Sequence, residues 1–169
     1  MKTNIKSKEE YINLFADQIW DRETLVNAET GRFEDRFTPT LYALYKGLDR
    51  FIEAQDKRNV YQTALEEVKS GKKKTHWIWY IFPQMQGLET SEKSKFYGIS
   101  SREEATQYIN HPILRDRLVE ITEAVYNNEN TVYEIFGNDA IKVRSCMLLF
   151  ASVCDIPIFK KMIQKYCWK

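Results

Sequence analysis

The sequence has few of the residues from which familiar catalytic and metal sites are built. It contains two histidines and three cysteines among 169 residues, and none of them shows the Cys–His spacing of a zinc site. It has no glycine-rich phosphate loop and no Gly-x-Ser-x-Gly nucleophile elbow. We therefore expect no metal and no cofactor, and the motifs predict no reaction.

Long apolar segments are also absent. No run of about 18 apolar residues, the length that a membrane helix requires, occurs in the chain. The basic N-terminus is not followed by an apolar stretch of signal-peptide length. The odd number of cysteines (Cys146, Cys154 and Cys167) is typical of free thiols in a reducing compartment. These features predict a soluble, cytoplasmic protein without membrane contact.

The sequence also lacks an excess of either charge. The chain has 25 basic and 24 acidic residues, which gives a formal net charge of +1. Non-specific binding to nucleic acid depends on many uncancelled cations, because its affinity comes largely from phosphate neutralisation and counterion release. The balance disfavours that class of partner, although it is compatible with a local basic patch. The sequence identifies no protein partner.

What the chain does have is abundant apolar and aromatic material. Hydrophobic residues make up 43% and aromatic residues 14% of the sequence, which is enough for the core of one domain. Apolar residues recur at helical spacing, most regularly at Leu114, Leu118, Ile121 and Val125. We predict an all-α fold, with a single compact domain over residues 47–169 and an N-terminal helical extension over residues 1–46.

Capping signals and breakers set the predicted helix boundaries. Ser7 with Glu10 forms a capping box at the start of the extension. Gly71 is placed to end a helix, and Pro157 to begin one. The stretch from 84 to 100 is polar and non-periodic, which predicts a loop. The helices expected after the first one cover residues 39–52 with a potential break at Gly47, 57–70 with Asp56 as cap, 76–82, 101–110, 112–126, 132–136, 140–153 with Asn138 or Asp139 as cap, and 157–167.

The segment from His76 to Phe82 is the first candidate for function. It holds seven consecutive bulky residues, which is wider than an amphipathic stripe, so we expect a short buried helix rather than a strand. Its tryptophans could stack on a planar ring, and His76 is the one candidate for a general base. The alternative is that the aromatic side chains are core and that His76 bonds a backbone carbonyl. The candidate ligand-binding residues here are Lys74, His76, Trp77, Trp79 and Gln84.

The second candidate is the start of the predicted helix over 140–153. Lys142, Arg144 and Ser145 lie next to apolar neighbours, so we expect the Arg144 guanidinium to be partly buried. A buried arginine requires a carboxylate or phosphate partner. The pattern fits two interpretations equally. The guanidinium binds an anionic ligand, or it forms an internal ion pair with an acid, for which the candidates are Glu53, Asp56 and Glu67.

Several ordered sequence blocks resemble one family, the domain-of-unknown-function family 1810. The resemblance runs from about residue 48 to the C-terminus, implies an all-α fold, and brings no activity with it. Similar proteins usually continue past Tyr166–Lys169 with a glycine-containing tail, so this chain is expected to be shorter than they are. The matching blocks are Arg50–Gln55, His76–Gln84, His111-Pro112 with Leu114, Ile135–Gly137 and Lys142–Phe150.

Together these patterns give two hypotheses about function. In the first, the tryptophan segment and the Lys142–Ser145 segment form a pocket for a small anionic, nucleotide-like molecule. In the second, the aromatic motif is purely structural and the chain is a protein–protein interaction module, with an exposed patch on the N-terminal extension. The first hypothesis requires an open pocket that contains these residues, and the second requires them to be sealed and paired internally.

Overall fold

The structure is a computed structural model that describes residues 20–21, 26–27 and 47–169. The chain divides into a unit of residues 1–50 and a unit of residues 51–169. The helix predicted after Ser7 lies outside the described residues, as does most of the one predicted over 39–52.

In the first unit, two short strands pair antiparallel. They are β1 (Trp20–Asp21) and β2 (Val26–Asn27), with Trp20 opposite Asn27 and Asp21 opposite Val26. The sequence did not predict this pair, because two residues are too few to show the alternation of a strand.

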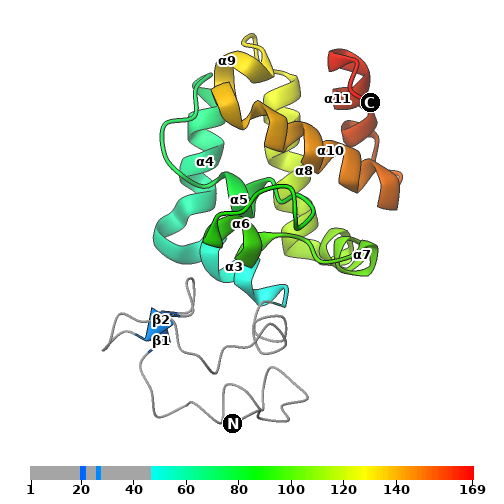
Figure 1. Cartoon of the computed structure of the whole chain (residues 1–169). Helices are drawn as coiled ribbons and strands as arrows, with labels where there is room; N and C mark the ends of the chain where they lie inside the picture. Colours follow the sequence, from blue (N-terminus) through cyan, green and yellow to red (C-terminus); the bar gives the residue numbers. More distant parts are fainter. Residues whose placement is uncertain (1–19, 22–25, 28–46) are drawn as a thin grey trace. The chain divides into compact units, whose positions relative to one another are not determined.

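From residue 47 onward the described chain is helical, as predicted (Figure 1). Its strand-like contact is an isolated parallel bridge between Met85 and Ile99. The helices are α3 (Asp49–Asp56), the short 3-10 helix η1 (Lys57–Asn59), α4 (Val60–Lys69), α5 (Ile78–Ile81), α6 (Glu92–Tyr97), α7 (Arg102–Asn110), α8 (Pro112–Tyr126), α9 (Val132–Phe136), the 3-10 helix η2 (Gly137–Asp139), α10 (Ala140–Val153) and α11 (Pro157–Tyr166).

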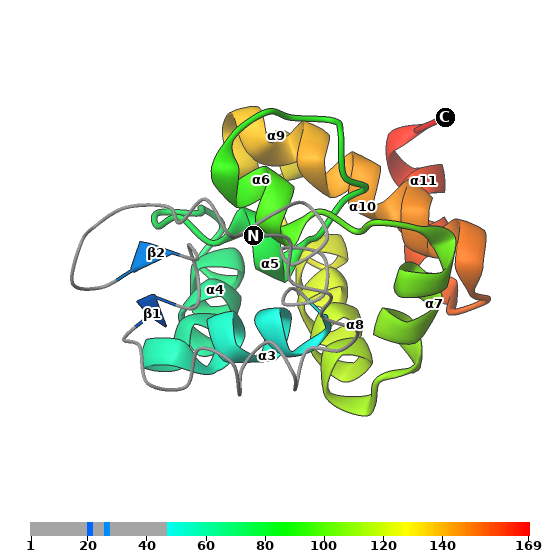
Figure 2. The same cartoon turned by 60° about the horizontal axis from the view of Figure 1, so that its bottom comes forward.

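The long helix α8 runs through the middle of the second unit. It contacts α4, α7 and α11, while α10 packs against α7, α9 and α11 (Figures 1 and 2). The predicted stripe of α8 faces this core, because Leu114, Leu118, Ile121 and Val125 are all buried. Aliphatic side chains on one face of a helix are removed from water only when other helices cover that face.

Several helix boundaries follow the predicted signals. Gly71 adopts a positive φ of 89° after α4, where a Cβ would also lie 2.5 Å from the Asn130 side chain. Ser101 accepts a hydrogen bond from the Glu104 backbone at the start of α7, and α11 begins at Pro157. The local signals therefore fixed these ends before any tertiary contact is considered.

Three details of the prediction are wrong. The stretch 84–100 is not all loop, since it contains α6 with Ser91 as its N-cap. Neither Asp56 nor Asp139 forms a side-chain capping bond, because both carboxylates pair with basic side chains instead. The segment 76–82 is not buried all round, since Tyr80 is half-buried. It is also not helical throughout, since only the four residues of α5 form a helix.

Among the described residues, no helix is both long enough and apolar enough to cross a membrane.

Candidate functional site

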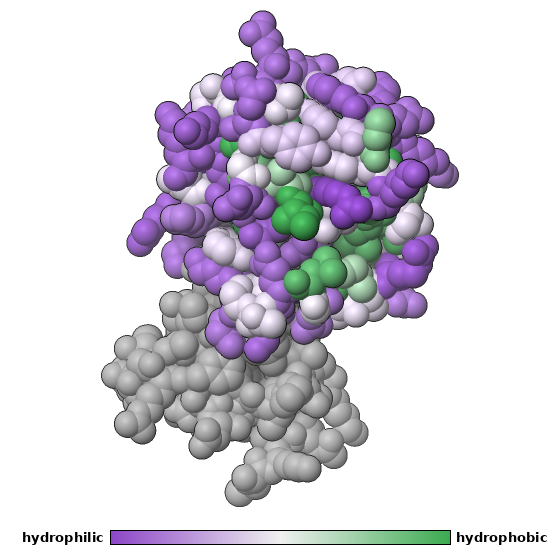
Figure 3. Space-filling view, turned by 45° about the horizontal axis from the view of Figure 1, so that its top comes forward, coloured by the Kyte–Doolittle hydropathy of each residue, from purple (hydrophilic) through white to green (hydrophobic). Residues whose placement is uncertain are grey.

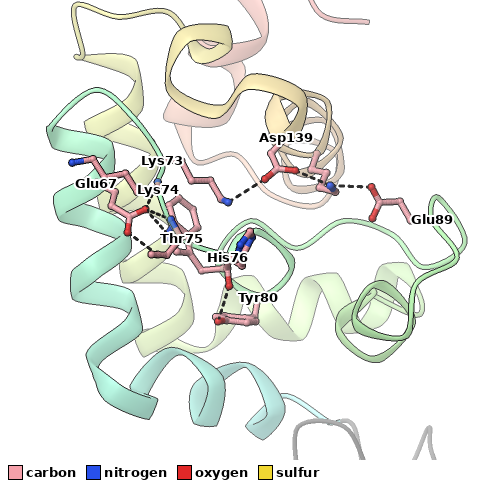
Figure 4. A network of polar contacts seen from close by, with 10 residues as sticks. Glu67, Lys73, Lys74, Thr75, His76, Tyr80, Glu89 and Asp139 are labelled. Carbon is pink, nitrogen blue, oxygen red and sulfur yellow. Dashed lines mark hydrogen bonds and ion pairs between the residues drawn. The ribbon is translucent and has the colours of Figure 1, made fainter.

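One buried carboxylate holds the loop that leads into α5. Glu67 accepts hydrogen bonds from the backbone nitrogens of Lys74 (2.6 Å) and Thr75 (2.9 Å) and from the Thr75 hydroxyl (2.6 Å). The indole nitrogen of Trp77 donates a fourth bond at 3.1 Å (Figure 4). Burial opposes ionisation of Glu67, but these donors outweigh it and lower its pKa. The carboxylate thereby fixes the path of the chain from 72 to 77.

The aromatic residues around α5 divide between core and surface. Trp77 and Phe82 are buried and contact Phe136 edge-on, so both belong to the core. Trp79 is half-buried, and the Lys93 ammonium lies 5.0 Å from the centre of its ring. Successive residues of a short helix point in different directions, so some side chains of this continuous bulky run face the core and others face the surface.

Trp79 lines a small cleft that is open to solvent. Its cavity volume is about 10 Å³, which is room for about one water molecule. The cleft is therefore too small to enclose a ring, so a ligand would lie against its opening. It is lined by Ile78, Trp79, Phe82, Gln84, Ser94, Tyr97, Gly98 and Lys142, which come from α5, the segment after it, α6 and the start of α10.

A row of alternating charges includes Lys142, which lines the cleft. Lys73 lies 3.1 Å from Asp139, and Asp139 lies 2.8 Å from Lys142. The Lys142 ammonium is also 3.1 Å from Glu89 (Figure 4). We call Lys73, Asp139, Lys142 and Glu89 the charge row. Two lysines and two carboxylates balance one another within it.

The ion pairs favour the charged forms of Lys142 and Asp139. Burial disfavours the charged form of Lys142, but hydrogen bonds to Asp139 and Glu89 outweigh this and raise its pKa. Burial likewise opposes ionisation of Asp139, while hydrogen bonds from Lys142 and Lys73 lower its pKa. Lys142 therefore enters the cleft as a cation whose charge is already compensated.

The backbone fixes the rim of the cleft at Gln84 and Gly98. The Gln84 carbonyl accepts a bond from Ile99, and the Gln86 backbone nitrogen donates to the Ile99 carbonyl, both at 2.9 Å. Gly98 lies so close to this segment that a Cβ would be 2.8 Å from the Gln86 Cα atom. Glycine allows the two segments to approach, and no hydrogen bond of the Gln84 side chain occurs within the described chain.

The cleft brings together three of the residues singled out from the sequence, namely Trp79, Gln84 and Lys142. The others lie elsewhere. Trp77 is buried, so its ring is not available to a ligand. His76 is exposed, does not line the cleft, and accepts a bond from the Tyr80 hydroxyl through its own carbonyl. The Lys74 side chain is exposed, while its backbone bonds Glu67.

Arg144 and Ser145 do not line the cleft either. Arg144 is half-buried as expected, but its guanidinium donates to the carbonyl of Lys169 instead of joining Lys142. Of the acids proposed as its partners, Glu67 is occupied by the loop and Asp56 pairs with Arg117. Ser145 bonds the Ile141 carbonyl one turn earlier on α10.

Several residues of the site could not be predicted from their sequence context. Ser94, Tyr97 and Gly98 lie in the stretch 84–100 that the sequence predicts to be a loop, and Glu89 lies in the same polar stretch. Ser91, followed by an acidic residue and by Phe96 and Tyr97, is the one local signal that could have predicted α6.

Comparison with known proteins gives one family and one solved structure. The model of the family described as "Protein of unknown function (DUF1810)" matches residues 45–168. The crystal structure at 1.38 Å of the conserved hypothetical protein Rv1873 from Mycobacterium tuberculosis is similar, with 40% sequence identity and a TM-score of 0.69. That similarity covers 72% of this chain and 89% of the other. No curated protein matches the sequence.

The match extends over most of the chain and includes α3, the Glu67 loop, the cleft and the charge row. The helical fold from residue 47 onward and the family model therefore agree, and the chain belongs to the DUF1810 family of proteins of unknown function.

Proposed function

We propose that this protein binds a small, planar, nucleotide-like molecule against the opening of the cleft beside α5. The observation that carries the proposal is that three side chains with different chemical groups lie at one opening. Trp79 supplies an aromatic surface, Gln84 an amide and Lys142 an ammonium. Small-molecule sites characteristically combine a mostly apolar lining with a few convergent polar groups.

The geometry of the lining supports this choice of ligand. Ile78, Phe82 and Tyr97 lie behind the opening and are almost fully buried, so a ligand meets mainly Trp79, Gln84 and Lys142, which are half-buried. The Trp79 ring offers an apolar surface that favours a ring over a fully hydrated ion. The exposed ammonium of Lys93 lies beside the Trp79 ring, where it can meet an anionic group that projects from the cleft. A nucleoside monophosphate has both parts, a flat base and a phosphate.

A thermal-shift screen with AMP, GMP, CMP and UMP tests the proposal. A ligand at a hundredfold excess over its Kd stabilises a protein by about 2.7 kcal/mol through mass action, and we expect at least one nucleotide to raise the Tm. The Trp79→Leu variant should lose this response. Tyr133→Leu is the matched control, since Tyr133 is 56% exposed and does not line the cleft.

The alternative function is a protein–protein interaction module, and the screen separates it from ligand binding. If no nucleotide changes the Tm of the wild-type protein, the ligand-binding proposal fails. On the face drawn in Figure 3, the apolar surface forms small areas bordered by polar residues. Leu88 and Ile141 are among the large apolar residues with high exposure, at 59% and 62%.

A further inference from the structure

We propose that two copies of this chain pair through the outer face of α10, with the two α10 helices antiparallel across a twofold axis. The outer face is the stripe of Ile141, Ser145, Leu148 and Ser152, which lie on one side of the helix. The proposal does not depend on ligand binding. It is carried by the composition of α10, by the hydrogen bonds of its serines, and by the placement of charged and apolar residues at its two ends.

The helix α10 is apolar on nearly every side. Apart from Lys142, Arg144 and two serines, all its residues are apolar. Its inner face packs against α7, α9 and α11. On the outer face Ile141 is 62% exposed and Leu148, two turns further on, is half-buried. A helix that is apolar all round is normally buried all round, so this outer face is typical of a surface that another element covers.

The two serines of the outer face can leave water at little cost. The Ser145 hydroxyl donates to the Ile141 carbonyl at 3.1 Å, and the Ser152 hydroxyl donates to the Leu149 carbonyl. Burying a hydroxyl is costly when its hydrogen bond is lost, but these bonds are made within the helix and persist after burial. Serine is also small, so a second helix can approach closely at these positions.

The distribution of charge makes the face complementary to its own copy. The two charged residues of α10, Lys142 and Arg144, lie near its N-terminal end. Past its C-terminal end, Asp155 is exposed and forms no ion pair with the described residues. In an antiparallel pair Arg144 lies at the end that carries Asp155 of the partner subunit, whereas a parallel pair would bring the cations together. The helix dipoles also favour the antiparallel arrangement. Such self-complementarity is what a twofold interface requires.

Apolar side chains at the two ends of α10 match in the same arrangement. Leu88 is 59% exposed, and the ion pair of its neighbour Glu89 with Lys142 holds this loop beside the N-terminal end of the helix. Val153 and Ile156 are half-buried at the other end. An antiparallel copy lays one end over the other, so these apolar groups cover one another and leave water.

The length of the helix sets the expected strength of pairing. The 14 residues of α10 span about 21 Å, so the contact is short. Contacts that bury less than about 1,200 Å² in total are characteristic of weak complexes. The net charge of +1 means that two copies repel each other little. We therefore expect a dissociation constant of about 10–100 µM.

Sedimentation equilibrium of the full chain, at concentrations of about 5–500 µM, tests this inference. We expect the average mass to rise from that of one chain toward that of two. Ile141→Glu should weaken pairing by about tenfold or more, because both copies then bring a carboxylate into the apolar contact. Ile113→Glu is the matched control and should pair like wild type, since Ile113 is another exposed isoleucine, on α8.

A charge reversal tests the orientation. Arg144→Glu should weaken pairing, because it faces Asp155 of the partner subunit, and adding Asp155→Arg to the same chain should restore pairing. Failure of the double variant to restore pairing overturns the antiparallel arrangement.

Three further results would overturn the proposal. A wild-type chain that stays monomeric at about 500 µM leaves this face to a different protein. Unchanged pairing by Ile141→Glu shows that another surface is used. A mass beyond two chains excludes a closed pair. If Ile141→Glu loses its circular dichroism spectrum, Ser145→Arg, which places a large side chain in the middle of the contact, serves in its place.

Discussion

Replacing Glu67 by glutamine is expected to destabilise the protein strongly, although the substitution changes one atom of the side chain. The carboxylate is 8% exposed and accepts four hydrogen bonds, from Lys74, Thr75 (twice) and Trp77. The glutamine amide keeps one acceptor oxygen and turns an NH₂ group toward some of these donors. The site therefore loses acceptors at the point where the loop depends on them.

The magnitude follows from the donors that are left without a partner. A hydrogen bond to a charged group contributes about 1.5–3 kcal/mol, and a buried unsatisfied donor costs about 1–3 kcal/mol. The loop donors are only partly buried and can be hydrated, whereas the Trp77 indole cannot. We expect Glu67→Gln to lower the free energy of unfolding by about 2–4 kcal/mol at neutral pH. Glu66→Gln, its exposed neighbour, should change it by less than about 0.5 kcal/mol.

The same reasoning fixes a pH dependence. The folded-state pKa of Glu67 is lowered, so the unfolded chain binds its proton at a higher pH than the folded chain does. The stability from ionised Glu67 is thus complete above the ordinary glutamate pKa of about 4.3 and is lost as pH falls through the lower folded-state value. Glu67→Gln has no such proton, so the difference between the two proteins should narrow at acidic pH.

Urea unfolding followed by far-ultraviolet circular dichroism, at pH 7 and at about pH 3.5, measures both effects. Equal stability of wild type and Glu67→Gln at pH 7 would refute the role of this carboxylate. A difference that stays constant between the two pH values would refute the assignment of its charge.

Other variants give further expectations that calorimetric unfolding can check. Phe82→Ala should lose about 3–5 kcal/mol, because the ring is 1% exposed, while Trp79→Ala should lose less than Phe82→Ala because its ring is only half-buried. Gly98→Ala should lose about 1–3 kcal/mol and weaken ligand binding, since its Cβ would lie 2.8 Å from the Ser94 carbonyl. Arg144→Met should change stability by about 1 kcal/mol or less, because its hydrogen bond to the Lys169 carbonyl is exposed. A loss of 3 kcal/mol or more for Arg144→Met would instead indicate a buried ion pair.

The helical fold could be predicted because its signals are local. The apolar stripe of α8, the glycine after α4 and the proline at the start of α11 each act over one or two helical turns. The buried faces of the short helices α5 and α6 lacked such signals. The four residues of α5 and the six of α6 are helices whose faces are set by what covers them rather than by their own periodicity.

The candidate site was predictable in its chemistry and only partly in its geometry. Residue types pointed to Trp79, Gln84 and Lys142, which the fold brings to one cleft. The sequence could not predict which of Trp77 and Trp79 is buried, because a shift of two positions along a short segment changes which ring faces the core. Nor could it show that Glu89, 53 residues from Lys142 in the chain, compensates that cation. Such pairings depend on tertiary structure and have no local pattern.

The central claim is that a flat ring binds beside Trp79 and Gln84, and an NMR titration of the ¹⁵N-labelled full chain with adenosine tests it most directly. The account predicts that the indole N–H of Trp79, the side-chain amide of Gln84 and the backbone amide of Gly98 shift together and saturate at one concentration. The indole N–H of Trp77, which is buried against Glu67, should move little. Shifts confined to residues outside the cleft, or no shift at saturating adenosine, would contradict the account.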